Sequence, residues 1–468
     1  MKGKGAAVAA VLTGVLILER LVHLEAKNHP VHEVLALAVL LFLGGFTLTG
    51  RLLSGALLAL WAYSGVRGAT ALKEHYLQQP LQAQDLAGAT VGEVWDLVQQ
   101  YPAAAGTIFL HIGLFFFFLR AGLSSGRWVA RMGTALAAIL VFVHVRSYAE
   151  KPGITAVNPE SASVLSFIST FFQAPPSLDS SLASAPFQMA PQCPEVKKNV
   201  FMILEESTFL PSDVDMDPNL SDFFQGDVDA GPLRVHVVGG TTHLSEFAWI
   251  TGFPHVLLSG NNIFPQLHLV GRFRKTLPQL LKECGYVTTV VYPSRRNFRN
   301  SEKWYRSVGF DRIISGDELG VKSWRTEDRF FFMEALKTAD QVEGNRPHFI
   351  YVLTINQHGP HKRDDPRADY IERLRHSARD YRWLKDQLSV SSQRSGQAWL
   401  LAWFGDHRTS IELDGPQKWQ TWFALNHISA GGGREGDSIG SRGARKQALD
   451  IAHLNRVVQR AVGVSWTG

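Results

Sequence analysis

Cysteine is scarce in this sequence of 468 residues, which contains only Cys193 and Cys284. Neither residue lies in a C-x-x-C motif, so a zinc site built from cysteine thiolates is strongly disfavoured. If both cysteines lie outside a membrane they can form one disulfide bond. The sequence alone does not show whether they meet, so the pairing stays open at this point.

The sequence also lacks a concentrated block of basic residues. Its 47 Lys and Arg residues exceed its 42 Asp and Glu residues only slightly, which gives a formal net charge of +5. Nucleic-acid-binding proteins usually gather basic residues in one patch or stripe, whereas here they are spread along the chain. We therefore expect no nucleic acid among the partners.

Charged residues are sparse in the first third of the chain, where long apolar stretches dominate. Candidate membrane spans lie within residues 6–24, 34–66, 104–119 and 128–145, and the second range is long enough for two short helices. A signal peptide at 6–24 is disfavoured because further apolar segments follow and no small-residue cleavage site is evident. Residues 1–150 therefore predict a transmembrane domain of about five helices.

Basic residues in the short connections between these spans predict the orientation of the protein. They occur at Arg51 and between Arg120 and Arg131, and the positive-inside rule then places the N-terminus in the cytoplasm and everything after residue 147 outside. Residues 151–195 are rich in Pro, Ser and Ala, which predicts a linker containing one helix at 160–173. Residues 196–468 are the expected extracytoplasmic domain.

Short, continuous apolar runs recur in residues 196–468, with helical patterns between them. The runs span 199–204, 286–292, 348–354, 398–404 and 421–425, and the helical patterns cover 276–284, 326–340, 370–389 and 446–462. Continuous apolar runs are typical of strands that are buried on both faces. Strands that alternate with helices predict an α/β domain with a mainly parallel central sheet.

Three of the predicted strands end in polar clusters. The first runs into Glu205 and Glu206, the third into His358, and the fourth into Asp406 and His407. Ligands collect at the carboxyl ends of the strands in such sheets, so these side chains are expected to converge. Carboxylate and histidine ligands without cysteine predict one divalent metal ion, manganese (Mn²⁺) or zinc (Zn²⁺), with Mg²⁺ less favoured.

Residues 239–252 read GGTTHLSEFAWITG and form a polar stretch that none of the apolar runs includes. A cation beside a threonine lowers the pKa of the hydroxyl and makes it a better nucleophile. Gly239 and Gly240 would let the backbone approach metal and substrate closely. We therefore predict that one threonine attacks phosphorus and carries a covalent phospho-intermediate, and that the neighbouring His243 contacts the substrate or carries a proton. The alternative is an ordinary loop.

These residues, in this order, resemble the sulfatase/alkaline-phosphatase superfamily, and most of all its lipoteichoic acid synthase and phosphoglycerol transferase branch. That branch has five N-terminal spans followed by an extracytoplasmic catalytic domain, and the resemblance covers most of residues 196–430. It implies metal ligation by Glu206 in LEES, with Glu205 as runner-up, by Thr242 in GTTHLSEF, and by Asp406 and His407 in GDH. It also makes Thr242 the nucleophile and His358 in NQHGP a substrate-side histidine.

The sequence departs from that branch in YPSRRNFRNSEKWYRSVGFD, where the family places a histidine and then a Trp-x-Arg that grips the phosphoglycerol head group. Tyr292 stands at the histidine position, and Phe298 and Arg299 stand near the Trp and Arg positions. Arg295, Arg296 and Arg299 are suited to bidentate binding of phosphate. Arg296, Phe298 and Arg299 are therefore predicted substrate contacts, while recognition of glycerol stays open.

Together these features predict a membrane-embedded, metal-dependent transferase of the bacterial inner (plasma) membrane, with its catalytic domain on the periplasmic or extracytoplasmic side. It would move an alcohol-phosphate, with phosphoglycerol favoured, from a membrane phospholipid donor to an envelope glycan or lipid acceptor through phospho-Thr242. His358 would assist the leaving group or activate the acceptor hydroxyl.

Three alternatives remain. A phosphoethanolamine transferase is less favoured because the paired cysteines common in many such enzymes are mostly absent. The second is a sulfatase-like phosphodiesterase or hydrolase, although the C/S-x-P-x-R context of a sulfatase is not found at 239–247. The third is a catalytically inactive membrane scaffold, which would gain nothing from keeping a metal site.

Overall fold

The computed structural model describes residues 190–466, except 215–216, 238–240, 259–264, 297, 322–324, 342–345, 359–360, 362–364, 410–418 and 430–444. The chain separates into two compact units, Met1–Phe172 and Gln173–Gly468, and all described residues belong to the second. The five predicted spans and most of the predicted linker lie outside the described residues. Within these residues, no helix combines the length and the apolar character needed to cross a bilayer.

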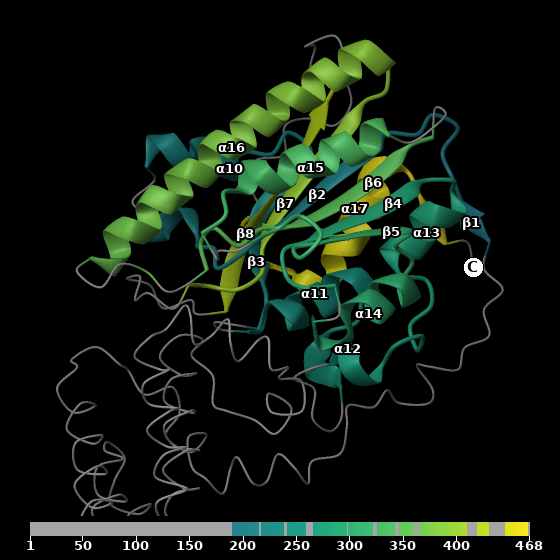
Figure 1. Cartoon of the computed structure of the whole chain (residues 1–468), viewed down its shortest axis with the longest axis horizontal. Helices are drawn as coiled ribbons and strands as arrows, with labels where there is room; N and C mark the ends of the chain where they lie inside the picture. Colours follow the sequence, from purple (N-terminus) through teal and green to yellow (C-terminus); the bar gives the residue numbers. More distant parts are fainter. Residues whose placement is uncertain are drawn as a thin grey trace, which may run out of the picture. The chain divides into compact units, whose positions relative to one another are not determined.

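The domain is built around one eight-stranded sheet (Figure 1). In spatial order the strands are β5 (Arg312–Ser315), β4 (Val287–Tyr292), β6 (His348–Leu353), β2 (Asn199–Glu205), β7 (Trp399–Gly405), β8 (Gln420–Ile428), β3 (Asp229–Arg234) and β9 (Leu449–Asp450). The first five are mutually parallel, whereas β8 is antiparallel to both of its neighbours. This confirms the predicted mainly parallel sheet.

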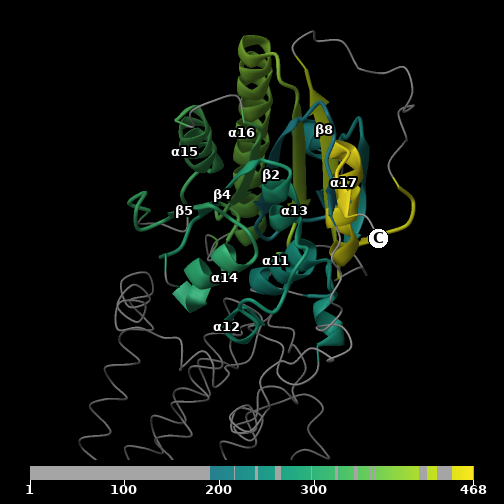
Figure 2. The ribbon, with the colours of Figure 1, turned by 90° about the vertical axis from the view of Figure 1, so that its right-hand side faces the viewer.

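Helices cover both faces of the sheet, so the domain has three layers (Figure 2). One face carries α10 (Ser221–Phe224), α15 (Asp328–Asp340) and α16 (Pro366–Ser395), and the other carries α11 (Thr242–Thr251), α13 (Leu277–Glu283), α14 (Ser301–Ser307) and α17 (Leu454–Val462). The short helix α12 (Pro265–His268) packs against α11 and α14. Single 3-10 turns are η1 (Pro211–Val214), η2 (Pro218–Leu220), η3 (His255–Leu257), η4 (Phe298–Asn300) and η5 (Ile451–His453).

The central strand β2 shows why the apolar runs are continuous. Val200, Met202 and Leu204 enter the core beneath α11, α13 and α17, while Phe201 and Ile203 enter the core beneath α15 and α16. Because side chains alternate between the two faces of a strand, a strand with helices on both sides needs apolar residues at every position. All five predicted strands are present for this reason.

The helices differ more from the sequence-based expectation. The helix predicted at 446–462 begins only at Leu454, so the prediction was wrong for its first turns. Leu449 and Asp450 instead form β9 beside β3, and the Asp450 carboxylate accepts a hydrogen bond from the Ala452 N–H (3.0 Å) at the start of η5. Helix α16 is longer than predicted because Asp365 caps its start and Gly396, with φ of 70°, ends it.

A two-stranded sheet joins the two ends of the described domain. Strand β1 (Pro191–Gln192) pairs antiparallel with β10 (Ser465–Trp466). Next to β1, Cys193 forms a disulfide bond with Cys284 at the end of α13, across 91 positions of sequence. The pairing that the sequence left open is therefore present.

Candidate active site

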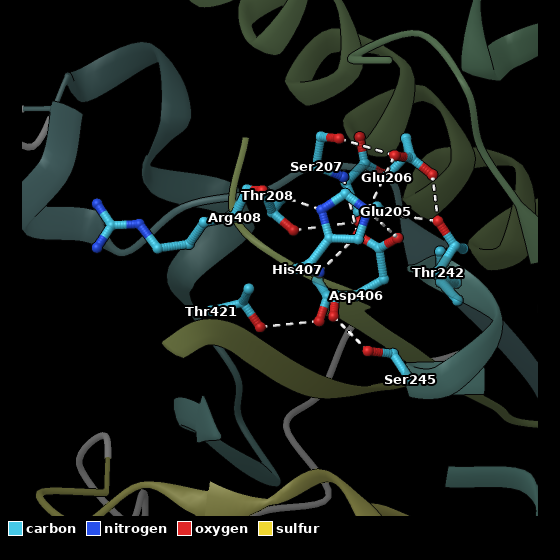
Figure 3. Close-up of polar contacts among 12 residues, drawn as sticks. Glu205, Glu206, Ser207, Thr208, Thr242, Ser245, Asp406, His407, Arg408 and Thr421 are labelled. Carbon is cyan, nitrogen blue, oxygen red and sulfur yellow. Dashed lines mark hydrogen bonds and ion pairs between the residues drawn. The ribbon is translucent and has the colours of Figure 1, made fainter. Parts of the chain in front are cut away.

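The predicted polar residues meet at the carboxyl edge of the sheet (Figure 3). Glu206 follows β2, Asp406 and His407 follow the neighbouring β7, and Thr242 is the first residue of α11. Ligand atoms of Glu206, Asp406 and His407 all lie within 4.8 Å of one another, so these three residues could hold a metal ion. Gly239 and Gly240, which precede Thr242, lie outside the described residues.

The threonine hydroxyl lies directly against this group. Thr242 Oγ1 donates a hydrogen bond to Glu206 Oε2 (2.9 Å) and is 3.4 Å from His407 Nε2. His407 Nε2 is in turn 3.2 Å from Asp406 Oδ2 and 3.4 Å from Glu206 Oε1. Four side chains from three separate segments thus point their polar atoms at one small volume.

The electrostatics of this volume are those of crowded buried charges. Burial and the nearby Glu206 carboxylate raise the pKa of Asp406 to about 7. Burial opposes ionisation of His407, but Asp406 and Glu206 outweigh it and raise its pKa to about 9. Burial likewise raises the pKa of Glu206, and His407 overcomes this and lowers it to about 2. Two buried carboxylates here require a compensating positive charge, which a divalent cation would supply.

The orientation of the ligand atoms also fits a cation. Asp406 Oδ1 accepts hydrogen bonds from the backbone N–H groups of Ser207 (2.8 Å) and His407 (2.7 Å). Asp406 Oδ2 is fully buried and has no hydrogen-bond partner within the described residues. His407 Nδ1 lies 2.9 Å from the Arg408 carbonyl oxygen, which fixes the ring and leaves Nε2 facing the carboxylates. The residues present therefore fit a bound divalent metal.

Glycine at position 405 explains why Asp406 follows it directly. A Cβ atom on Gly405 would overlap the side chain of Thr208, so the two segments can approach this closely only with glycine there. Thr421 Oγ1 donates to the Gly405 carbonyl (2.8 Å), and Ser245 Oγ donates to the Asp406 carbonyl. The Gly-Asp-His motif is thus held on both sides by neighbouring hydroxyl groups.

Ser207 belongs to the candidate site, although the motifs did not single it out. It has a left-handed backbone with φ of 54°, which is costly for a residue other than glycine. Its N–H binds Asp406, its Oγ donates to Glu206 Oε1 (2.7 Å), and its carbonyl accepts from the Tyr370 hydroxyl (2.6 Å). The strained turn therefore orients the carboxylates of Glu206 and Asp406. The only sequence feature that could have indicated Ser207 is its position after two glutamates at the end of a predicted strand.

The structure separates Glu206 from Glu205. Glu205 is on the α15 and α16 side of the sheet, where it interacts with Asp328, Gln357 and Ser377. Burial and the nearby Asp328 raise its pKa well above the ordinary value. Of the two candidate glutamates, only Glu206 belongs to the group with Asp406 and His407.

His358 lies close to the same group on the β6 side. Its charge contributes to lowering the pKa of Glu206, which places it within electrostatic reach of that carboxylate. Its backbone carbonyl accepts a hydrogen bond from Arg373 Nη1 (2.9 Å), as does the Asn356 carbonyl (3.1 Å). Arg373 is itself buried and bonds to Asp369 (2.6 Å) on α16. Residues of α16 thus fix the loop that carries His358.

The residues predicted to contact the substrate each have intramolecular contacts of their own. The His243 carbonyl accepts a hydrogen bond from Gln266 of α12. Arg299 lies over the Phe298 ring at 5.0 Å in η4. Arg296 is tied to Glu302 (2.9 Å) and Glu318 (2.6 Å), two pairs that hold the loop after β4. Its donors therefore have intramolecular partners, and its role in substrate binding stays a prediction.

Tyr292 occupies the end of β4, where the resembling family has a histidine. Its ring packs against the Tyr305 ring at 5.4 Å, and burial together with Glu246 raises the pKa of its hydroxyl above the ordinary value. The side chain is therefore a neutral phenol that packs beneath the edge. It does not replace a histidine as a titrating group near neutral pH.

Comparisons with known proteins agree with this geometry. Residues 198–385 match the Sulfatase family model. An uncharacterised protein of Haemophilus influenzae is 25% identical over 455 residues, covering 84% of this chain and 80% of that protein. The structure of the integral membrane protein lipooligosaccharide phosphoethanolamine transferase A from Neisseria meningitidis is 12% identical, with a TM-score of 0.55, and covers 97% of this chain and 95% of its own. The lipoteichoic acid synthase LtaP from Listeria monocytogenes is 15% identical, with a TM-score of 0.44, and covers 57% and 72%.

The match to the Sulfatase family model lies within the described domain and agrees with the sulfatase-like motifs. At 12% identity, the likeness to the phosphoethanolamine transferase shows a shared fold.

Proposed function

We propose that this protein is a metal-dependent transferase that moves an alcohol-phosphate from a membrane phospholipid to an envelope glycan or related lipid acceptor. One observation carries the proposal. The Thr242 hydroxyl donates to Glu206 inside the buried group formed with Asp406 and His407. A hydroxyl in an ordinary loop has no reason to lie against three buried ionisable side chains that fit a cation.

The chain's own residues account for the steps. Glu206 orients the Thr242 hydroxyl, and the N-terminal end of α11 favours negative charge on its oxygen. As the oxygen attacks phosphorus, its proton passes along the hydrogen bond to Glu206. The bond to the diacylglycerol oxygen breaks, and His358 donates a proton to that oxygen. An acceptor hydroxyl then attacks phosphorus and its proton passes to His358, while the Thr242 oxygen leaves and takes its proton back from Glu206. A bound cation would lower the pKa of the hydroxyl and polarise the phosphoryl oxygens.

Manganese or zinc is the proposed metal, because the ligands are carboxylate and imidazole groups without thiolates. Glu206, Asp406 and His407, together with Thr242, would hold it. The proposed substrate contacts are Arg296, Phe298, Arg299 and His243. Phosphoglycerol is favoured as the transferred group and phosphoethanolamine is the alternative. A phosphodiesterase that passes the group to water would use the same first step.

The proposed location is the bacterial inner membrane, with this domain on the extracytoplasmic side. The apolar stretches in residues 1–150 and their basic connections support it. The Cys193–Cys284 disulfide supports the same side, because structural disulfides persist in oxidising compartments.

Release of diacylglycerol tests the proposal. The purified full chain is incubated with vesicles containing phosphatidylglycerol or phosphatidylethanolamine and with Mn²⁺ or Zn²⁺, beside Thr242→Ala and the matched control Thr251→Ala at the far end of α11. We expect metal-dependent release from one lipid, lost in Thr242→Ala and kept in Thr251→Ala. Equal release by Thr242→Ala would contradict the assigned nucleophile.

A further inference from the structure

Three exposed apolar side chains belong to two segments that meet after β3. Among the described residues, Val256 and Leu257 in η3 are 50% and 66% exposed, and Trp419, immediately before β8, is 53% exposed. Single exposed apolar residues are common, whereas contiguous ones mark an interaction surface.

Two contacts bring the separate segments into one neighbourhood. The ring of His255, which precedes Val256, lies 6.3 Å from the ring of His236. Val235, which precedes His236, donates its N–H to the Trp419 carbonyl (2.9 Å). The η3 turn and Trp419 therefore flank the same short stretch after β3.

This neighbourhood adjoins the catalytic residues on two sides. Trp419 is two residues before Thr421, whose hydroxyl donates a hydrogen bond to the carbonyl of Gly405 in the Gly-Asp-His motif. On the other side, α12 follows η3 and returns to the start of α11, where Gln266 binds the His243 carbonyl next to Thr242. Helices α11, α12 and α14 lie at one end of the domain in both views (Figures 1 and 2).

The charge of the surrounding segment has one sign. Residues 247–282 contain no Asp or Glu, whereas Arg272 and Arg274 in this segment are exposed. The ring of Phe273 between them packs 6.1 Å from the ring of Phe253, which joins these arginines to the η3 turn. Within the described part of the chain, neither guanidinium takes part in an ion pair with an acidic side chain.

We propose that Val256, Leu257 and Trp419, together with Arg272 and Arg274, form a docking rim that rests on an anionic bilayer surface. Apolar side chains would enter the head-group region, tryptophan is enriched at such interfaces, and arginines are attracted by anionic lipids. Docking would bring the Thr242 site down to the phosphodiester of its lipid donor. The inference rests on the proposed function for that donor, but its test needs no turnover.

A nitroxide label reports whether the rim meets lipid. Both native cysteines are in the disulfide, so a single introduced cysteine is the only free thiol for labelling. The full chain is labelled at Leu257→Cys, with Val390→Cys on α16 as a matched control of 46% exposure. Each label is measured in detergent and in vesicles of phosphatidylcholine with or without phosphatidylglycerol. Power saturation with oxygen and with a water-soluble nickel chelate compares lipid and water access.

We expect the ratio of oxygen access to nickel access at position 257 to rise in the anionic vesicles, with no change at position 390. Arg272→Gln with Arg274→Gln should reduce the ratio of docked to undocked label by roughly five-fold for each arginine. Nickel access at 257 in anionic vesicles equal to that at 390 would overturn the proposal. So would shielding of 257 from both reagents in detergent, which would indicate a protein partner, or equal docking on neutral vesicles. Docking without a phospho-Thr242 adduct would keep the rim and refute the proposed function instead.

Discussion

A buried glutamate one turn after the candidate nucleophile gives the sharpest test of the electrostatics at this edge. Glu246 on α11 is 5% exposed, and its Oε1 accepts a hydrogen bond from the Tyr305 hydroxyl (2.7 Å). Burial raises the pKa of its carboxyl to about 7, against the opposing hydrogen bonds of Tyr305 and Tyr351. The folded protein therefore keeps a proton on Glu246 between pH 4.5 and 7 that the unfolded chain has lost.

The sign of the stability change follows from this difference. The folded state is not penalised below pH 4.5, and its free energy of unfolding falls as the pH rises towards 7. A shift from 4.5 to about 7 corresponds to a loss of about 3 kcal/mol at high pH. Glu246→Gln stays neutral and keeps an acceptor oxygen for Tyr305. It should therefore gain about 2–3 kcal/mol over the parent between pH 5 and pH 8.

Thermal unfolding at the two pH values measures this gain. For a domain of this size, the difference between the melting temperatures of variant and parent should grow by roughly 5–10 °C from pH 5 to pH 8. Glu283→Gln, at the exposed end of α13, is the control and should show no such growth. A Glu246→Gln variant that tracks the parent at both pH values would refute the buried-carboxyl reasoning.

Three further predictions concern the metal group, the loop of His358 and the disulfide. Asp406→Asn should lower metal affinity by more than the roughly 10–100-fold that is typical when a residue supporting a ligand is lost. The measurement is the metal bound to the purified protein, and unchanged metal content would contradict the role of Asp406 as a ligand. Arg373→Lys removes the paired donation that fixes the His358 loop, so kcat should fall roughly 10–100-fold while bound metal stays constant, and loss of metal would refute this positioning role. Replacing Cys193 and Cys284 by Ser should lower the free energy of unfolding by roughly 2–5 kcal/mol, because the bond closes a loop spanning 91 positions. An unchanged melting temperature would contradict the bond.

The sheet was predictable because burial leaves a direct mark on the sequence. β2 and β7 have apolar residues at every position through which they cross the core, and each ends in the polar residues that form the site. The short edge strands β5 and β9 carry no such mark and were missed, as was β3, whose apolar run is interrupted by Gly231 and Pro232. The helix starting at Thr242 was missed because its first turn begins with a β-branched residue and has no side-chain cap.

The residues that support the site were not predictable, because their contacts are remote in sequence. Tyr370 and Arg373 are unremarkable positions in a long helix until α16 crosses the ends of β2 and β6. The left-handed Ser207 is likewise defined by the partners it meets. Motifs identified the candidate ligands in Gly-Asp-His, but only the fold separates Glu206 from Glu205.

The most direct test of the central claim is intact-protein mass spectrometry of the full chain after incubation with phosphatidylglycerol or phosphatidylethanolamine and Mn²⁺ or Zn²⁺, with Thr242→Ala as the control. We predict an adduct with the mass of glycerophosphate on Thr242, absent from the alanine variant. An adduct with the mass of phosphoethanolamine would keep the mechanism and change the donor. Protein that holds metal yet forms no adduct on Thr242 with either lipid would contradict the account.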